Sequence, residues 1–370
     1  MKILLDARPS MGGMARYISA LHAQLTRALP PGEVSTHGIA ALKWGQPPGS
    51  AASSARRALR LLAGGVVRVA DDHVLLPRRA ACEDADLFHA TFNIIPRTLR
   101  IPSVITVYDL WPIHHLRERP FGWRRYYERN QMLQSIRRAS RILPGSRSIG
   151  RELMEFMDVD ASRVIPVYPL LPPPPDPDPR TPERHHLPER FTLSVGTLEP
   201  RKNLSRMIEA QCAAYPRTGF PLILAGARGW RDAEILRAIS AAGPAVRWLG
   251  YVPDAELAWL ETHTEAMIQF SRYEGFDYPV AEALRAGCAL VLSNIEIHRE
   301  IAGETAVYVP PDDPGALTAA LTRIPDTNDA ERARASERAR NRFSELFPAD
   351  AIRFYLDAYR GALESEPATG

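Results

Sequence analysis

Cysteine is scarce in this sequence, and the three cysteines that occur are far apart. Cys82, Cys212 and Cys288 lie in apolar or mixed surroundings, and their spacing is not that of a cysteine-based metal site. Because three cysteines cannot all pair with one another, we expect a chain that folds without disulfides in a reducing cytoplasm.

Long apolar runs are also missing. No stretch approaches the roughly 20 residues that a membrane-spanning helix needs. The first residues, Met1–Asp6, reach an acidic side chain too early for a secretory signal peptide. We therefore expect neither a membrane span nor a signal peptide.

The formal net charge is only +3, but the two halves of the chain differ in sign. Residues 1–165 contain 24 Lys+Arg and 14 Asp+Glu, whereas the remaining residues contain 22 and 29. A basic first half favours an anionic partner, such as phospholipid or an acceptor that carries a diphosphate. No recognised nucleic-acid motif accompanies the charge, so we expect no nucleic-acid partner.

Two stretches of the first half combine arginine with apolar or aromatic residues. One contains Arg56, Arg57 and Arg60, and the other is Phe121–Tyr127. This mixture suits the interface of an anionic bilayer, and it equally suits an ordinary helix with an apolar core face. Peripheral contact with an anionic membrane is thus one of two open interpretations.

Strand-like and helix-like segments alternate along most of the 370 residues, which predicts doubly wound α/β domains. In the first half, buried strands are predicted at Lys2–Leu5, Leu87–His89, Val104–Val107 and Arg141–Leu143. Further strands, separated by helices, are predicted within 191–309. The length suits two such domains.

A change in composition marks the boundary between these domains. Residues 166–190 are rich in proline and include the run Pro172–Pro175, which cannot sustain a helix or a central strand. We predict an N-terminal domain over 1–165, an extended linker over 166–190 and a C-terminal domain over 191–345. An amphipathic helix is predicted within the last segment, 346–370.

Two glutamates of the second half, Glu274 and Glu282, form the most informative pattern. A strand-like run ends just before Glu274, and a proline suits the first turn of the helix that carries Glu282. Between them, the backbone N–H groups of Gly275 and Phe276 lie at a positive helix end, which suits a phosphate, while carboxylates suit sugar or ribose hydroxyls. A bare pair of glutamates is more often a pair of solvated surface charges.

A second pattern precedes it, between a predicted strand and a predicted helix. Gly196 and Thr197 form the turn, and Arg201 and Lys202 come just before Asn203, a residue that suits a helix N-cap. Two adjacent cations at a helix start suit a diphosphate, whose charge they neutralise as it leaves. We expect both cations to be exposed; the alternative is a pair of solvated basic residues.

The first half contributes weaker candidates. Gly12 and Gly13 form a glycine turn after the first strand, which does not match the dinucleotide-binding pattern. Tyr108 and Asp109 end another strand, and Asp109 is a candidate to orient or deprotonate an acceptor hydroxyl. An ordinary turn residue is the alternative for Asp109. His89 follows a further strand.

Two histidines, His114 and His115, follow Asp109 closely and are alternative candidates for the same role. Surface histidines in a loop are the more common case. Asp71-Asp72 and Asp312-Asp313 lack the D-x-D context of metal-dependent transferases, so no metal site is predicted.

Together these motifs resemble those of the retaining GT-B glycosyltransferases of family 4. EGFDYPVAEALRAGCALVLS, starting at Glu274, resembles the Glu-x7-Glu block, and GTLEPRKN, starting at Gly196, resembles relatives that move mannose-type sugars. The family more often has Gly-Leu at the positions of Asp277 and Tyr278, and a histidine at the position of Tyr108.

The resemblance implies a GT-B fold, in which two Rossmann-like domains face a central cleft and the last helix crosses back to the first domain. It places Glu274 at the donor sugar and Glu282 at the ribose of a sugar nucleotide. It also assigns the diphosphate to Arg201 and Lys202. The remaining candidates line the donor site (Gly196, Thr197, Gly275, Phe276, Asp277) or the acceptor-side and phosphate loops (Gly12, Gly13, Tyr108, His89).

We therefore expect a cytoplasmic, retaining, metal-independent hexosyltransferase that needs no cofactor. Its donor would be a nucleotide diphosphate sugar, with GDP-mannose first, and its acceptor a glycan or lipid-linked glycan of polysaccharide or lipopolysaccharide biosynthesis. The alternatives are a non-catalytic GT-B subunit of a glycan-assembly complex and another enzyme on this fold, such as a nucleotide-sugar epimerase or hydrolase.

Overall fold

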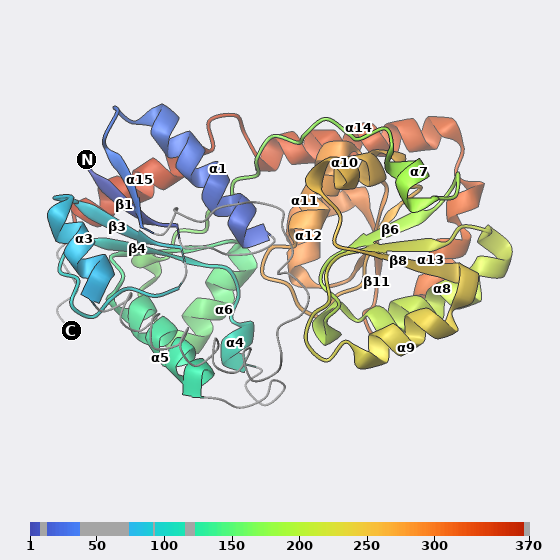
Figure 1. The fold of residues 1–370 in the computed structure, drawn as a ribbon, viewed down its shortest axis with the longest axis horizontal. Coiled ribbons are helices and arrows are strands. Elements are labelled where there is room, and N and C mark those ends of the chain that lie inside the picture. Colours follow the sequence, from blue (N-terminus) through green and yellow to red (C-terminus); the bar gives the residue numbers. More distant parts are fainter. Residues whose placement is uncertain (8–12, 38–73, 92, 115–122, 366–370) are drawn as a thin grey trace. The chain divides into compact units, whose positions relative to one another are not determined.

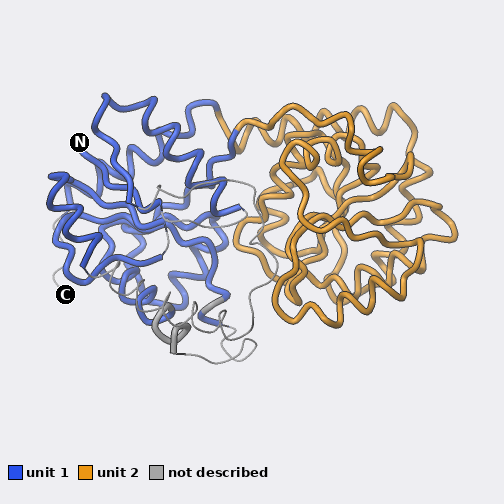
Figure 2. Tube along the Cα trace, viewed as in Figure 1, with its two compact units in different colours: residues 1–172, 349–370 blue, residues 173–348 orange. Residues whose placement is uncertain are grey.

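The chain forms two compact units (Figure 2). Unit 1 comprises residues 1–172 and 349–370, and unit 2 comprises residues 173–348, so the chain passes from one unit to the other twice. The computed structural model describes residues 1–7, 13–37, 74–91, 93–114 and 123–365.

Unit 1 is built on a parallel sheet with the strand order β2-β1-β3-β4-β5. Strands β1, β3 and β4 are labelled in Figure 1. Strands β1, β3 and β4 are entirely buried, as expected for parallel strands covered on both faces, whereas the edge strand β2 is mostly half-buried. The strands are β1 (Ile3–Asp6), β2 (Val34–His37), β3 (Leu87–Ala90), β4 (Ser103–Val107) and β5 (Arg141–Pro144).

The helices of unit 1 include one from the far end of the chain, α15, which packs against α1 and against β3, β4 and β5. Its Tyr355 and Tyr359 are among the largest fully buried side chains. The helices are α1 (Gly13–Ala28), α3 (Leu76–Cys82), α4 (Trp111–His114), α5 (Trp123–Arg138), α6 (Arg147–Met157) and α15 (Ile352–Leu363).

Unit 2 is built on a second parallel sheet with the strand order β11-β10-β9-β6-β7-β8. Apolar side chains of β7, β9 and α8 form much of its core. The strands are β6 (Thr192–Val195), β7 (Leu222–Ala225), β8 (Val246–Gly250), β9 (Met267–Gln269), β10 (Leu290–Ser293) and β11 (Ala306–Val309).

Helices α8 to α12 connect these strands, whereas α7 precedes β6, and α13 and the long α14 follow β11. Helix α14 packs against α11. The helices of unit 2 are α7 (Thr181–His185), α8 (Leu204–Thr218), α9 (Ala233–Ala241), α10 (Asp254–His263), α11 (Tyr278–Ala286), α12 (Glu296–Ala302), α13 (Pro314–Thr322) and α14 (Asp329–Leu346). Within the described ranges, no helix is both long and apolar enough to cross a bilayer.

The proline-rich segment differs in part from the extended linker predicted over 166–190. Residues 173–179 do lie outside helices and strands, but Thr181–His185 form α7, with Pro182 in its first turn. The helix is fixed by Glu256 of α10, whose carboxylate contacts Arg184 and lies 2.7 Å from His185 Nε2. This segment belongs to unit 2 from Pro173 onward.

Candidate active site

The candidate site lies in unit 2, at the point where the strand order of the sheet reverses. β6 and β9 are neighbours, whereas β7 and β8 continue to one side and β10 and β11 to the other. In open parallel sheets, ligands bind at the carboxyl ends of the strands beside such a switch point. Both stretches of predicted donor-site residues begin there, one after β6 and the other after β9.

Gly196 is the turn residue directly after β6. Its φ is +152°, which side chains rarely adopt, and a Cβ at this position would lie 3.1 Å from Cε of Lys202. The glycine therefore lets the Lys202 side chain pass close to the backbone. Gly196, Thr197 and Lys202 lie together along one pocket.

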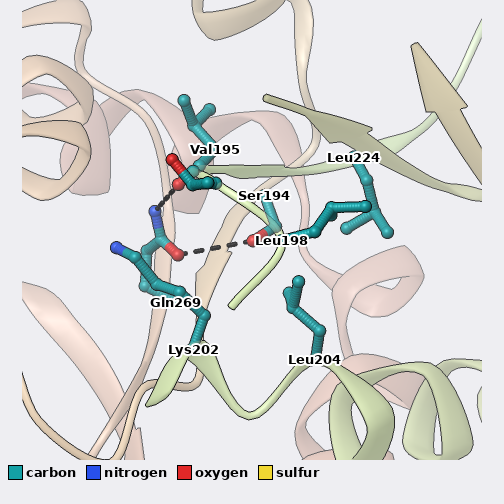
Figure 3. A pocket seen from close by; sticks show the side chains of 9 residues that line it. Ser194, Val195, Leu198, Lys202, Leu204, Leu224 and Gln269 are labelled. Carbon is teal, nitrogen blue, oxygen red and sulfur yellow. Dashed lines mark hydrogen bonds between the residues drawn. The ribbon is translucent and has the colours of Figure 1, made fainter. Parts of the chain in front are cut away.

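The same pocket shows how β6 and β9 are held together (Figure 3). The Gln269 amide group donates from Nε2 to the carbonyl oxygen of Val195, 2.7 Å away, and its Oε1 accepts from Ser194 Oγ at 3.3 Å. Gln269 is buried, so these bonds satisfy a polar group that would otherwise be costly there. They fix the two strand ends that carry the candidate residues.

Glu274 binds both predicted cations. Arg201 Nη1 lies 2.5 Å from Glu274 Oε2, and Lys202 Nζ lies 2.7 Å from Oε1. Burial alone would raise the pKa of Glu274, but the charges of Arg201 and Lys202 outweigh burial and lower this pKa to about 2. The carboxylate is therefore ionised at neutral pH.

Lys202 is the buried member of the cation pair. Its residue is 6% exposed, whereas Arg201 is half-buried, so the expectation of two exposed cations is wrong for Lys202. Burial lowers the pKa of a lysine, but Asp277 and Glu274 outweigh it and raise the pKa of Lys202. The ammonium group stays charged because two carboxylates face it.

Asp277 stands at the N-cap of α11 in the left-handed region, with a φ of 64°. Its fully buried carboxylate reaches two partners. Oδ1 lies 3.5 Å from Lys202 Nζ, and Oδ2 lies 3.0 Å from His298 Nε2. Asp277 therefore links Lys202 to a histidine that the sequence patterns did not point to.

His298 was missed because no motif marks it and no helix was predicted around it. It lies in α12, follows β10, and is fully buried. Ile297 and Ile301 are also buried, and their spacing is the one signal in the sequence that favours a helix with an inward face here.

The helix that carries Glu282 has a proline in its first turn, as predicted. α11 begins with Tyr278 and Pro279 and ends at Gly287, whose φ is 80°. Glu282 is 4% exposed on this helix. Gly275 and Phe276 are buried in the preceding loop, where the Phe276 ring packs edge-on against Tyr278.

In unit 1, Tyr108 and Asp109 directly follow β4, as predicted. Asp109 Oδ1 accepts a hydrogen bond from the backbone N–H of Trp111 at 3.2 Å, which is the bond of an ordinary turn residue. The Tyr108 ring lies edge-on to Tyr17, with 5.6 Å between the ring centres. Both residues are half-buried.

Other first-half candidates are partly outside the described residues. Gly13 begins α1, while Gly12 is not among the described residues. His114 Nε2 lies 2.9 Å from Glu152 Oε1, and His115 is not described. The basic stretch 56–68 and the acidic pair 71–72 also lie outside the described residues.

His89 belongs to a strand, as the predicted range Leu87–His89 indicates, and not to a loop that follows it. It lies inside β3, fully buried, where Nδ1 lies 2.7 Å from the Tyr359 hydroxyl and Nε2 lies 2.8 Å from Thr106 Oγ1. Burial lowers the pKa of His89 to about 3. The ring is a neutral structural group that joins the sheet of unit 1 to α15.

Among the described residues, no group of three or more His, Cys, Asp and Glu side chains is arranged to hold a metal ion. Asp312, one of the aspartates considered above, is instead paired with arginines: its Oδ1 lies 3.2 Å from Arg206 Nη1 and 2.8 Å from Arg272 Nη2.

Comparison with known proteins gives two family matches. Residues 178–342 match the model for glycosyl transferases group 1, and residues 11–170 match that for glycosyltransferase family 4. The chain is 30% identical over 291 residues to the O-antigen chain mannosyltransferase B of Escherichia coli, covering 73% of this chain and 74% of that protein.

Two further proteins extend the comparison. The GDP-mannose:cellobiosyl-diphosphopolyprenol alpha-mannosyltransferase of Komagataeibacter xylinus is 33% identical over 158 residues, which is 40% of each chain. HepE of Anabaena, solved in complex with UDP and glucose, shares the fold with a TM-score of 0.69 at 17% identity, over 96% of this chain and 98% of that one. The two parallel α/β units have the GT-B fold, and the chain belongs to family 4 of the glycosyltransferases, the glycosyl transferases group 1.

Proposed function

We propose that this glycosyltransferase moves a hexose from a nucleotide diphosphate sugar to a glycan hydroxyl, with retention and without a metal ion. The observation that carries the proposal is the set formed by Arg201, Lys202 and Glu274 at the switch point of unit 2. The site is built from charged side chains that the fold holds in fixed positions.

The two cations are proposed to stabilise the leaving nucleotide diphosphate. Negative charge develops on the diphosphate as its bond to the sugar breaks, and preorganised cations lower the energy of that state. Lys202 is held by two carboxylates, so little reorganisation is needed when the ligand binds. In metal-dependent transferases a divalent cation supplies this charge; here we propose that Arg201 and Lys202 supply it.

The two glutamates are proposed to bind hydroxyl groups of the donor, Glu274 those of the sugar and Glu282 those of the ribose. Both oxygens of Glu274 already face cations, but a carboxylate has further lone pairs with which to accept a bond from a sugar hydroxyl. The ion pairs keep the carboxylate ionised, so it can accept a hydrogen bond from a sugar hydroxyl.

Retention is proposed to follow from front-side attack. The departing phosphate takes the proton of the acceptor hydroxyl, and Asp109 orients that hydroxyl. Tyr108 is a poor candidate for a base because a tyrosine with a pKa near 10 is protonated at neutral pH. This chemistry needs no covalent intermediate on the protein.

GDP-mannose is proposed as the donor because several relatives are mannosyltransferases and one is named for GDP-mannose. UDP-, dTDP- and other GDP-sugars are the competing donors. The proposed acceptor is a glycan or lipid-linked glycan, as in O-antigen assembly. A cytoplasmic location is a proposal that rests on the few, widely spaced cysteines, and contact with an anionic membrane is a proposal that rests on the basic first half of the sequence.

A thermal-shift screen of nucleotide sugars tests the donor. A ligand at 100 times its dissociation constant stabilises the native state by about 2.7 kcal/mol, so the cognate donor should raise the melting temperature above all others. The selected donor is then incubated in EDTA with the protein and a glycan acceptor, which takes the hexose. Release of the nucleoside diphosphate should persist without metal; loss of turnover that Mg²⁺ or Mn²⁺ restores would contradict metal independence.

A further inference from the structure

His298 lies outside every predicted site, yet it contacts the proposed donor site through Asp277. Its Nε2 is 3.0 Å from Asp277 Oδ2, and both side chains are fully buried. The other oxygen of Asp277 faces Lys202 Nζ at 3.5 Å. His298, Asp277 and Lys202 are thus connected in series, and Lys202 is the member that belongs to the cation pair of the site.

The hydrogen bonds at Nδ1 show that this nitrogen carries a proton. Nδ1 lies 2.9 Å from the carbonyl oxygen of Ser293, which can only accept. It also lies 3.0 Å from Ser293 Oγ, whose single hydrogen is donated to the carbonyl oxygen of Ser271 at 2.6 Å. Both neighbours of Nδ1 are therefore acceptors.

The contact at Nε2 then requires a second proton. A neutral ring that is protonated at Nδ1 presents a lone pair at Nε2, which would repel the Asp277 oxygen 3.0 Å away. A proton must lie between them. Lys202 faces the same carboxylate, so a proton on the ring would give Asp277 two cationic partners.

We propose that His298 is a positioning residue whose charge neutralises Asp277 and thereby leaves the charge of Lys202 to the donor diphosphate. Arg201 and Lys202 face three carboxylates, those of Glu274, Asp277 and Glu199, whose Oε2 lies 3.0 Å from Arg201 Nε. With His298 charged, the set is neutral; without that charge, the set has one net negative charge. The inference rests on the proposed function, since the anion it serves is the diphosphate.

The conformation of Asp277 supports this role. A φ of 64° favours glycine over aspartate, and a non-glycine residue there persists only when its surroundings hold it. The contacts with Lys202 and His298 are what hold Asp277. The buried Asp277–His298 pair is therefore held in a fixed position beside Lys202.

Three variants separate a charge effect from a packing effect: H298Q, D277N and the double variant. H298Q removes the third cation and leaves the set with one net negative charge. D277N removes a carboxylate, so the ring becomes neutral and the set stays neutral. The double variant is neutral as well.

Titration calorimetry with GDP and with UDP measures the consequence. H298Q should weaken nucleoside diphosphate binding about tenfold, the scale of one charge acting over about 8 Å at an effective dielectric constant of about 30. Adding H298Q to D277N should weaken binding by no more than about threefold beyond D277N alone, because the carboxylate that the ring neutralises is gone. Losses that add in the double variant would overturn the proposal, because they show a packing role.

NMR of the histidine ring nitrogens gives an independent readout. In ¹⁵N-labelled wild type at pH 7.5, the ring absent from the H298Q spectrum should have both nitrogens protonated; a ring with one unprotonated nitrogen would overturn the proposal. If neither GDP nor UDP binds the wild type, the proposed donor fails, while the NMR experiment still decides the charge of His298.

Discussion

Replacing Glu274 by glutamine should destabilise unit 2 by about 3 kcal/mol at neutral pH. The lowering of the Glu274 pKa from 4.5 to about 2 corresponds to about 3 kcal/mol of interaction that favours the ionised carboxylate in the fold. Glutamine has nearly the same shape but no charge. It therefore loses this interaction while the buried site stays filled.

The loss must depend on pH with a defined sign. The pKa of Glu274 is lowered by folding, so its contribution is fully present above about 4.5 and disappears as the pH falls towards 2. Wild type and E274Q should differ most at pH 7 and converge near pH 2. Hydrogen–deuterium exchange of peptides from β6 and β9, measured across urea concentrations, gives the free energy of unfolding of unit 2 separately from that of unit 1.

Glu265 offers a matched control at the amino end of β9, the opposite edge of the sheet from the candidate site. Its carboxylate also binds two arginines, Arg190 at 2.6 Å and Arg332, and these outweigh burial and lower the pKa of Glu265. E265Q should reduce stability and keep turnover, whereas E274Q should reduce both. Parallel pH profiles for wild type and E274Q would refute the reasoning.

Four further predictions follow from the same geometry. Arg201→Ala, or Lys202→Met to keep the buried volume, should lower kcat/KM by about 30- to 1,000-fold. This is the effect of losing about 2–4 kcal/mol of transition-state stabilisation from a charged group. Full activity of both variants in steady-state kinetics would show that neither residue belongs to the site. Glu282→Ala should weaken nucleoside diphosphate binding in calorimetry, while E274Q mainly lowers turnover; equal losses of affinity would show that the assigned roles are wrong. Asp109→Asn should lose most transfer activity without loss of nucleotide affinity, and an active variant would move the acceptor role elsewhere. Unit 1 should lose about 5 kcal/mol as the pH falls from 6.5 towards 3, because the unfolded chain protonates His89 first, and His89→Gln should flatten that part of its acid-unfolding curve.

The alternation of apolar strands and helices predicted both sheets because it depends on local sequence. Strands β1, β3, β4 and β5 lie within one residue of the predicted ranges, and Pro279 lies in the first turn of α11 as expected. The family resemblance assigned both donor-site stretches to one site, and they begin at neighbouring strands of the sheet, after β6 and β9. Strand positions and helix starts depend on residues that are close in sequence, so they can be predicted from the sequence.

Features that depend on distant partners were missed. Asn203 was expected to cap α8, but its side chain donates to the carbonyl oxygen of Pro311 at 2.7 Å and makes no capping bond. The burial of Lys202 and the role of His298 depend on β6, α11 and α12 coming together. His89 was misread for the same reason, because its partner Tyr359 lies 270 residues away in sequence.

The anomeric configuration of the first product tests the central claim most directly. The donor selected by thermal shift is incubated with the protein in EDTA, with a glycan acceptor or with water alone, and proton NMR follows the sugar before mutarotation. A retaining, metal-independent transferase should convert an α-linked donor into an α-linked product with release of nucleoside diphosphate. A β-configured first product, or conversion only when a divalent metal is added, would contradict the account.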